Sequence, residues 1–124
     1  MISPSASIRG IRLGDIYIVE WSPGRGSEQT GERPAVIVQN DAFNSNERYP
    51  NTIIVTVSKS GRAVPTHIQI PQTPENGLRE PLSYIKCEQL LTISKGRLGK
   101  RLGSLTPSEI TRVSAALKRV LSLG

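Results

Sequence analysis

The chain has 124 residues, of which 36% are hydrophobic, and it carries a formal net charge of +6 with a single cysteine. This length predicts one domain with one core, because a chain of this size buries roughly two-thirds of its unfolded surface without covalent staples. The lone Cys87 excludes an internal disulfide, and no apolar run approaches the roughly 20 residues that a membrane-spanning helix needs.

The chain begins with a segment that has no clear strand or helix pattern. We expect residues 1–12 to be a flexible N-terminal lead-in and residues 13–124 to form the folded domain. The first 15 residues lack the apolar region of a secretory signal, so the sequence predicts a reducing, cytoplasmic setting.

Alternation of apolar and polar residues with a period of two predicts short β-strands along most of the domain. These segments are rich in β-branched residues and are bounded by Gly, Pro or Asn. The predicted strands are Ile16–Trp21, Ala35–Gln39, Thr52–Ser58, Thr66–Ile70 and Leu82–Ile93, with Gly99–Leu105 as a further short one. Strands this short and numerous indicate a strongly bent sheet or small barrel, which closes its edges against unwanted pairing.

The end of the chain changes to a helical period. Thr106 to Glu109 has the pattern of a capping box with proline at the first helical position. Apolar residues then recur at spacings of three and four, namely Ile110, Val113, Leu117, Val120 and Leu121. We predict an amphipathic helix of roughly 15 residues here. A shorter helical turn is predicted at Asp41–Ser45, where Asp41 can act as the cap.

The excess positive charge lies in the last third of the sequence. Residues 1–85 contain eight basic and eight acidic side chains, whereas residues 86–124 contain eight basic and two acidic ones. A basic domain favours a polyanionic partner, nucleic acid first, because phosphate contacts release counterions. The basic run Ser94–Arg101 fits phosphate binding and fits a solvated face equally well.

The densest cluster of polar and turn-forming residues is GSEQTGERP, from Gly26 to Pro34. A plain hairpin needs only two to five connecting residues, so we interpret this longer segment as a working loop. This motif and its neighbours, in their order along the chain, resemble the MazF/PemK family of toxin endoribonucleases. The neighbouring segments are GDIYIVEWSP before the motif and AVIVQNDAFN, TIIVTVS, PTHIQI and CEQLLTISKGRL after it. The resemblance covers about residues 13–121.

The resemblance implies a mainly β fold with helices, an SH3-like or plasmid-maintenance-toxin small barrel with a C-terminal amphipathic helix. It also implies sequence-selective, metal-independent cleavage of single-stranded RNA by an mRNA interferase toxin without a cofactor. The implied partners are a second copy in a homodimer and a cognate antitoxin. The implied catalytic residues are Arg33, at the family's catalytic arginine, and Ser58, at the end of the next strand, where threonine is common.

Cleavage of RNA without a metal uses the 2′-hydroxyl as nucleophile. The site then needs a proton acceptor, a donor for the leaving 5′-oxygen and a cation for the phosphorane charge. Arg33 suits the cationic role, because its guanidinium presents several donors to phosphate oxygens and keeps its charge. Ser58 keeps a hydroxyl that can donate to a nonbridging oxygen, and a slip in the alignment would offer Thr56 or Lys59 instead.

Other polar residues are predicted to bind RNA or to support the site. Ser27, Glu28 and Gln29 of the motif are assigned structural or hydrogen-bonding roles. His67 is the only histidine, which excludes a two-histidine ribonuclease, and its strand can point it at a structural partner as easily as at substrate. The remaining supporting residues are Thr56, Lys59 and Gln89.

Three smaller features are interpreted as follows. No metal site is predicted, because one histidine, one cysteine and scattered acids show no ligand spacing. Asn40 and Asp41 are interpreted as a turn and a helix cap rather than as catalysts. Phe43 and Tyr49 lie in a polar loop and can stack on RNA bases.

Two other functions stay open. One is a barrel that binds nucleic acid or antitoxin but has weak or no catalysis, which Ser58 and Leu91 favour because the family often carries threonine and arginine there. The other is a gyrase-poisoning toxin on the same fold.

Overall fold

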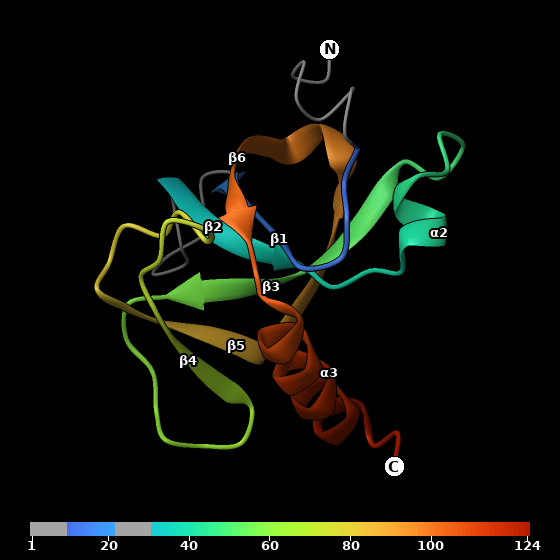
Figure 1. Ribbon diagram of the computed structural model, residues 1–124. Coiled ribbons are helices and arrows are strands. Elements are labelled where there is room, and N and C mark those ends of the chain that lie inside the picture. The colour runs from blue at the N-terminus through green and yellow to red at the C-terminus, as the bar shows by residue number, and fades with distance from the viewer. Residues whose placement is uncertain (1–9, 22–30) are drawn as a thin grey trace.

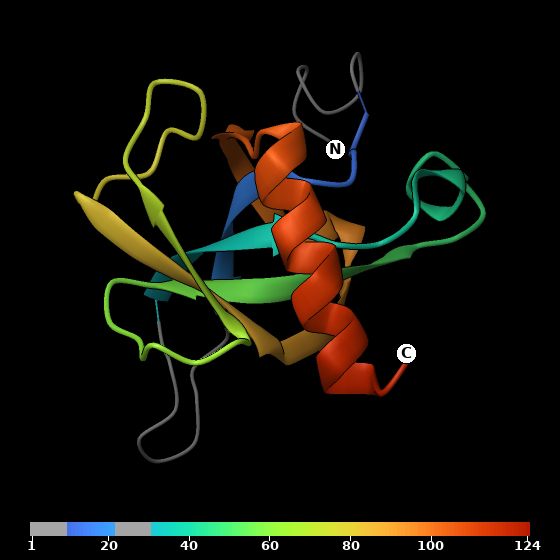
Figure 2. The same ribbon diagram turned by 60° about the horizontal axis from the view of Figure 1, so that its bottom comes forward.

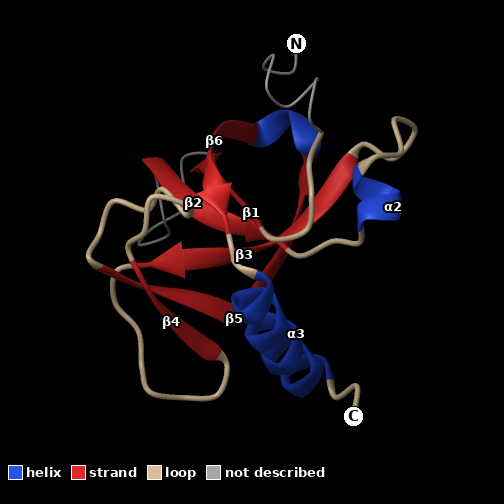
Figure 3. Ribbon diagram, in the orientation of Figure 1, coloured by secondary structure: helices blue, strands red, loops and turns tan. Residues whose placement is uncertain are grey.

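The computed structural model describes residues 10–21 and 31–124. These residues form six β-strands, two α-helices and one 3-10 helix (Figures 1 and 3). The strands are β1 Asp15–Trp21, β2 Gly31–Ile37, β3 Asn51–Ser58, β4 His67–Pro71, β5 Leu82–Ser94 and β6 Leu98–Ser104. The helices are α2 Asp41–Asn44, η1 Lys95–Arg97 and α3 Pro107–Leu121. The predicted mainly β fold with a C-terminal amphipathic helix is confirmed.

The strands form one antiparallel sheet in the order β4-β5-β3-β2-β1-β6. In a flat sheet of this order, β5 and β6 would lie roughly 19 Å apart, because neighbouring strands are spaced by about 4.8 Å. The three residues of η1 are all that joins these two strands in the chain. Such a connection spans on the order of 10 Å, so the sheet must curl to bring β5 and β6 together. The curl is visible in Figure 1.

The second strand begins earlier than the alternation predicted. β2 runs from Gly31 to Ile37 rather than from Ala35 to Gln39, so the last residues of the predicted loop belong to the strand. Pro34 lies opposite Ile18 of β1, whereas β3 pairs with β2 only from Ala35 onward. Because proline has no N–H to donate, it suits this part of β2, where β1 is the one strand that the described residues pair with it. The predicted boundary was wrong because Pro34 was interpreted as the end of a loop.

Helix α3 begins at the predicted capping box. The Glu109 N–H donates to Thr106 Oγ1 at 3.1 Å, and the Thr106 N–H donates to Glu109 Oε1 at 2.9 Å. Ser122 follows the helix in the left-handed conformation, which ends the helical hydrogen bonding. Figure 2 shows α3 lying across one face of the sheet, and the helix packs against β4 and β5.

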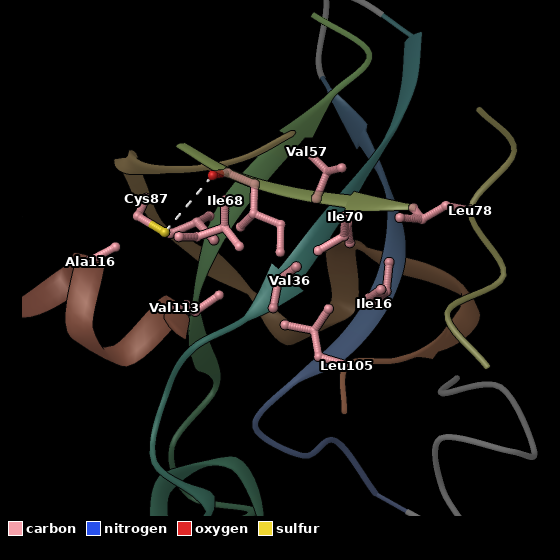
Figure 4. Close-up of a cluster of buried hydrophobic side chains, with 12 residues drawn as sticks. Ile16, Val36, Val57, Ile68, Ile70, Leu78, Cys87, Leu105, Val113 and Ala116 are labelled. Atoms are coloured by element: carbon pink, nitrogen blue, oxygen red, sulfur yellow. Dashed lines mark hydrogen bonds between the residues drawn. The ribbon is translucent and has the colours of Figure 1, made fainter. Parts of the chain in front are cut away.

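Two apolar clusters form the core, because neighbouring residues of a strand point to opposite faces of the sheet. In β1, Ile16 belongs to the first cluster and Tyr17 to the second. The first cluster lies between the sheet and α3, which contributes Val113 and Ala116 (Figure 4). The second cluster consists of Ile11, Tyr17, Val19, Ala35, Ile37, Ile54 and Ile93, with Leu98 packed against it.

The predicted lead-in lies mostly outside the described residues. The structure describes residues 10–12 of this segment. Among them, Ile11 is buried in the second cluster and packs with side chains of the sheet. The division of the chain at residue 12 stays a prediction.

The turn between β2 and α2 is held by its own polar side chains. Asn40 Oδ1 accepts a hydrogen bond from the Ala42 N–H at 2.6 Å, so the cap of α2 lies one residue before the predicted Asp41. Asp41 Oδ1 instead accepts from the Leu13 N–H at 2.7 Å, which ties the turn to the segment before β1. These contacts give both residues structural roles, in agreement with the interpretation of the sequence.

Candidate functional site

A pocket opens where β2 and β3 separate. The ladder between these strands contains three residue pairs and ends at Ala35 and Thr56. Beyond this point the two strands diverge with Arg33 on one side and Ser58 on the other. The pocket has a volume of about 240 Å³ and is lined by Ile18, Glu32, Arg33, Pro34, Val57, Ser58, Lys59, Leu78, Arg79, Glu80, Ser83 and Leu102.

Arg33 enters this pocket from β2. It lies opposite Val19 of β1 and is half-buried. Its Nε is buried and has no hydrogen-bond partner among the residues that the structure describes. Leaving a buried donor unpaired costs roughly 1–3 kcal/mol, so this guanidinium is suited to a ligand that supplies acceptor oxygens.

Ser58 and Lys59 enter the same pocket from the end of β3. Ser58 Oγ accepts a hydrogen bond from the Ser60 N–H at 3.3 Å. A hydroxyl that accepts from the backbone still has its own proton to donate, so Ser58 can donate to a ligand in the pocket. The structure therefore brings together three of the predicted residues, Arg33, Ser58 and Lys59, from two strands.

Thr56 and Gln89 form a separate pair outside the lining of this pocket. Thr56 is buried, and its hydroxyl donates to Gln89 Oε1. Gln89 lies in an irregular part of β5, where the register jumps from Leu90 opposite Val55 to Lys86 opposite Thr56. The hydrogen bond thus connects β3 to a bulge of β5.

His67 also lies outside the residues that line the Arg33 pocket. Its Nδ1 accepts a hydrogen bond from the Arg62 N–H at 2.9 Å, which places the proton of the neutral ring on Nε2. Nε2 then donates to Glu88 Oε2 at 2.7 Å. Both ring nitrogens are engaged, which favours the structural interpretation of this histidine.

Two neighbouring groups on β5 have shifted pKa values. Burial acts to raise the pKa of Glu88, but hydrogen bonds from His67, from its own backbone and from Thr66, together with the charge that His67 carries when protonated, hold that pKa below its ordinary value of 4.5. Burial, assisted by the charge of Glu88, raises the pKa of Cys87 to about 11. The Cys87 thiol therefore stays protonated at neutral pH and packs as a small apolar side chain.

We predict that Glu88→Gln removes a pH-dependent contribution to stability. Because the folded-state pKa of Glu88 is lowered, its contribution is present above pH 4.5 and is lost as the pH falls through the folded-state pKa. The Glu88 side chain is 41% exposed, so the effect is less than about 1 kcal/mol. Urea unfolding of both proteins at several pH values checks this: the difference in unfolding free energy shrinks below pH 4.5. A difference that grows on acidification contradicts it.

The structure also shows pocket residues that sequence reasoning missed. Leu78, Arg79 and Glu80 come from the connection between β4 and β5, and Glu32 comes from β2. No pattern in the sequence identified Leu78, Arg79 and Glu80, because only the folded path of residues 72–81 brings that connection beside Arg33, whereas Glu32 belongs to the motif GSEQTGERP and was not interpreted as a site residue. The predicted residues Ser27, Glu28 and Gln29 lie outside the described residues.

Phe43, Tyr49 and Lys95 form a cluster away from this pocket. The two rings are 5.3 Å apart between centroids, and Lys95 Nζ is 5.9 Å from the Tyr49 centroid. Lys95 Nζ also donates to the Phe43 carbonyl at 2.9 Å, and burial lowers the pKa of Lys95. Tyr49 precedes β3 and Ser58 ends it, so the cluster and the pocket lie at opposite ends of that strand. Stacking of these rings on RNA stays a prediction.

Neither a metal-binding cluster nor a membrane-spanning helix occurs in the part of the chain that the structure describes. Within residues 10–21 and 31–124, no three His, Cys, Asp or Glu side chains are grouped as they would be around a metal ion. In the same residues, no helix has both the length and the apolar character needed to cross a membrane.

Solved structures that superpose on this chain include toxins and endoribonucleases. The Mycobacterium tuberculosis toxin MazF-mt6 superposes with a TM-score of 0.72 at 21% identity, over 89% of this chain and 98% of that chain. An endoribonuclease in complex with its cognate antitoxin, from a mycobacterial species, superposes with a TM-score of 0.71 at 25% identity, over 90% of this chain and 95% of that chain. This chain therefore shares the fold of these two proteins.

Sequence comparison identifies the family. Residues 12–121 match the family described as the PemK-like, MazF-like toxin of type II toxin-antitoxin system. The endoribonuclease MazF of Staphylococcus epidermidis is 39% identical over 117 residues, which are 92% of this chain and 92% of that protein. The chain belongs to the PemK-like, MazF-like toxin family, as the motifs of the sequence predicted.

Proposed function

We propose that this protein is the toxin of a type II toxin-antitoxin pair and cleaves single-stranded messenger RNA as a metal-independent, sequence-selective endoribonuclease. The observation that carries the proposal is the meeting of Arg33, Ser58 and Lys59 at one pocket in a chain of this family. RNA as the substrate class is supported by the relative that is 39% identical and named an endoribonuclease.

The reaction is an intramolecular transesterification. The 2′-oxygen attacks the neighbouring phosphorus and loses its proton, the bond between phosphorus and the 5′-oxygen breaks, and the 5′-oxygen gains a proton. The products are a 2′,3′-cyclic phosphate, which water can open to a 3′-phosphate, and a 5′-hydroxyl. Negative charge builds up on the nonbridging oxygens during the attack, so fixed donors at these oxygens accelerate the step.

Each requirement of this reaction has a candidate in the pocket. Arg33 binds the nonbridging oxygens through a guanidinium whose Nε is unpaired among the described residues. Ser58 donates its hydroxyl proton to one of these oxygens or orients the 2′-hydroxyl. Glu32 and Glu80 line the pocket and provide carboxylates that can accept the 2′-hydroxyl proton. Lys59 lines the pocket, and its ammonium can donate the proton that the leaving 5′-oxygen gains.

The proposed partners follow from the family. A structural neighbour is an endoribonuclease in complex with its cognate antitoxin, so we propose a cognate antitoxin for this chain. A homodimer and a cytoplasmic location complete the proposal. The predicted division into a lead-in of residues 1–12 and a toxin domain of residues 13–124 is kept with it, and the family match of residues 12–121 supports the domain.

The proposal is tested by incubating the purified protein with a long single-stranded RNA in EDTA and analysing the new ends. The expected products carry a 2′,3′-cyclic phosphate or 3′-phosphate and a 5′-hydroxyl. Ends with a 5′-phosphate, or cleavage that needs an added divalent ion, would show that the mechanism is wrong. Binding of RNA without cleavage would favour the catalytically inactive barrel, and inhibition of gyrase without cleavage would favour the gyrase poison.

We predict that Ser58→Ala lowers the rate of cleavage, whereas Ser58→Thr retains or increases it. Loss of one hydroxyl donor to a developing charge is expected to cost on the order of tenfold to a hundredfold. Threonine keeps the hydroxyl and its β-branched side chain suits the end of a strand. Single-turnover cleavage of one labelled RNA checks both variants. If Ser58→Ala cleaves at the wild-type rate, the second catalytic role belongs to Lys59, because Thr56 and His67 lie outside the lining of the pocket.

A further inference from the structure

The connection between β4 and β5, residues 72–81, is held in one conformation by a buried amide. Asn76 is 1% exposed. Its Oδ1 accepts from the Thr73 N–H at 3.1 Å and from the Leu78 N–H at 3.0 Å, and its Nδ2 donates to the Pro71 carbonyl at 2.8 Å. A buried side chain with its polar groups bonded in this way fixes the backbone around it.

The same connection is docked onto β6. The Ser104 N–H donates to the Glu75 carbonyl at 2.9 Å. Gly77 has a φ of +65°, and a Cβ on it would lie 2.1 Å from the Leu102 carbonyl oxygen. Glycine is therefore needed for this approach. Leu78 follows and is buried in the first cluster, so the backbone of Arg79 is anchored on its N-terminal side.

A second cavity lies on this connection, next to the Arg33 pocket. Its volume is about 650 Å³, and it is lined by Gln72, Thr73, Pro74, Gly77, Leu78 and Arg79. Leu78 and Arg79 also line the Arg33 pocket, so the two cavities adjoin at these residues. Within the described part of the chain, the Arg79 guanidinium makes no ion pair. An exposed arginine on an anchored backbone thus stands at the boundary of two cavities.

A single strand of RNA carries one phosphate per nucleotide. If its scissile phosphate lies at Arg33, the next nucleotide extends out of that pocket, and the adjoining cavity of residues 72–79 is open to receive it. This cavity is shallow and open to solvent, which suits an extended strand that runs along the surface. Arg79 presents a forked guanidinium that matches a phosphate.

We propose that the cavity of residues 72–79 is a subsite for a nucleotide next to the scissile phosphate, and that Arg79 binds the phosphate of this nucleotide. The inference rests on the proposed function, because the scissile phosphate at Arg33 sets the direction of the strand. RNA is favoured over an acidic peptide because the cavity continues from the pocket in which cleavage is proposed.

The test compares wild type with Arg79→Ala, Arg79→Lys and the control Arg112→Ala, whose residue is exposed on α3 outside both cavities. The binding probe is a single-stranded oligonucleotide with every 2′-hydroxyl methylated, so that it cannot be cleaved. We expect Arg79→Ala to weaken binding on the order of tenfold and to lower the slope of log K against log salt by about one. Arg79→Lys should restore most of this slope, and Arg112→Ala should have the wild-type affinity and the wild-type slope.

Cleavage of ordinary RNA separates this inference from the proposed function. If Arg79→Ala cleaves and binds RNA as wild type does, with the same slope of log K against log salt, the subsite would be overturned and the proposed function would stay intact. If the protein cleaves no RNA, but Arg79→Ala still lowers the slope of log K against log salt, the subsite would be supported and the proposed function overturned. Unchanged RNA binding with lost binding of an acidic peptide would show that the cavity is a peptide site, and the inference would be wrong.

Discussion

Arg33→Ala is expected to lower the single-turnover rate of RNA cleavage by on the order of a hundredfold or more. This is the scale of loss when one preorganised stabiliser of transition-state charge is removed. Arg33 stands in the part of β2 that pairs with β1 alone, and Pro34 after it restricts its backbone to an extended conformation. The guanidinium is therefore partly positioned before RNA binds. Arg33→Lys should not restore the full rate, because an ammonium cannot make the bidentate contact with phosphate.

The fold should tolerate the loss of Arg33. Its Nε has no partner among the described residues, so the substitution breaks no hydrogen bond between that atom and this part of the chain. Circular dichroism and thermal unfolding of the variant serve as the folding control. Arg48→Ala serves as the charge control, because Arg48 is exposed in the connection between α2 and β3 and does not line the Arg33 pocket. A folded Arg33→Ala protein that cleaves at the wild-type rate would remove this arginine from the chemistry.

Gly103→Ala is expected to lower the free energy of unfolding by about 2 to 3 kcal/mol, at the upper end of the cost of overpacking. A Cβ at Gly103 would lie 2.0 Å from the Glu75 carbonyl oxygen and 2.7 Å from the Asn76 carbonyl carbon. These are backbone atoms of a connection that is itself fixed, so either β6 or the connection has to move. Such a movement would also displace Leu78 and Arg79 in the Arg33 pocket, and we expect cleavage to fall with stability.

Gly96→Ala is the matched control for Gly103→Ala. A Cβ at Gly96 would meet only Ser94 Oγ at 3.5 Å, an ordinary contact, and the residue is exposed. Its effect should stay within about 0.5 kcal/mol, as is usual for surface substitutions. Urea unfolding of the three proteins measures both values. Equal stability of Gly103→Ala and wild type would show that β6 and the connection are not tightly packed.

Local patterns predicted most of the fold. Alternation in β1, β3 and β5 and the capping box at Thr106 are properties of short segments, and the structure reproduces them. The start of β2 was mispredicted because Pro34 can belong to a strand only where no neighbouring strand needs its N–H. Whether β3 lies beside Pro34 is a property of the tertiary structure. The bulge around Gln89 escaped prediction for a related reason, since a register shift is visible only against the partner strand.

The candidate site was predictable in part. Arg33 and Ser58 were identified from motifs, and the structure places them at one pocket although 25 positions separate 33 from 58 in the sequence. The contribution of Arg79 and Glu80 could not be predicted, because it depends on the buried amide of Asn76 and on the docking of residues 72–81 onto β6. His67 was predicted to support the site or to face a structural partner, and its hydrogen bonds to Arg62 and Glu88 favour the structural role.

The proposed cleavage depends on attack of the 2′-hydroxyl on the phosphate held at Arg33. The most direct test is a single-stranded RNA in which only the nucleotide on the 5′ side of the cleaved phosphate carries a 2′-deoxy sugar. Cleavage at this phosphate should be abolished, whereas a 2′-deoxy sugar two nucleotides away should leave it in place. Continued cleavage at the phosphate that follows the 2′-deoxy sugar would show that the 2′-hydroxyl is not the nucleophile.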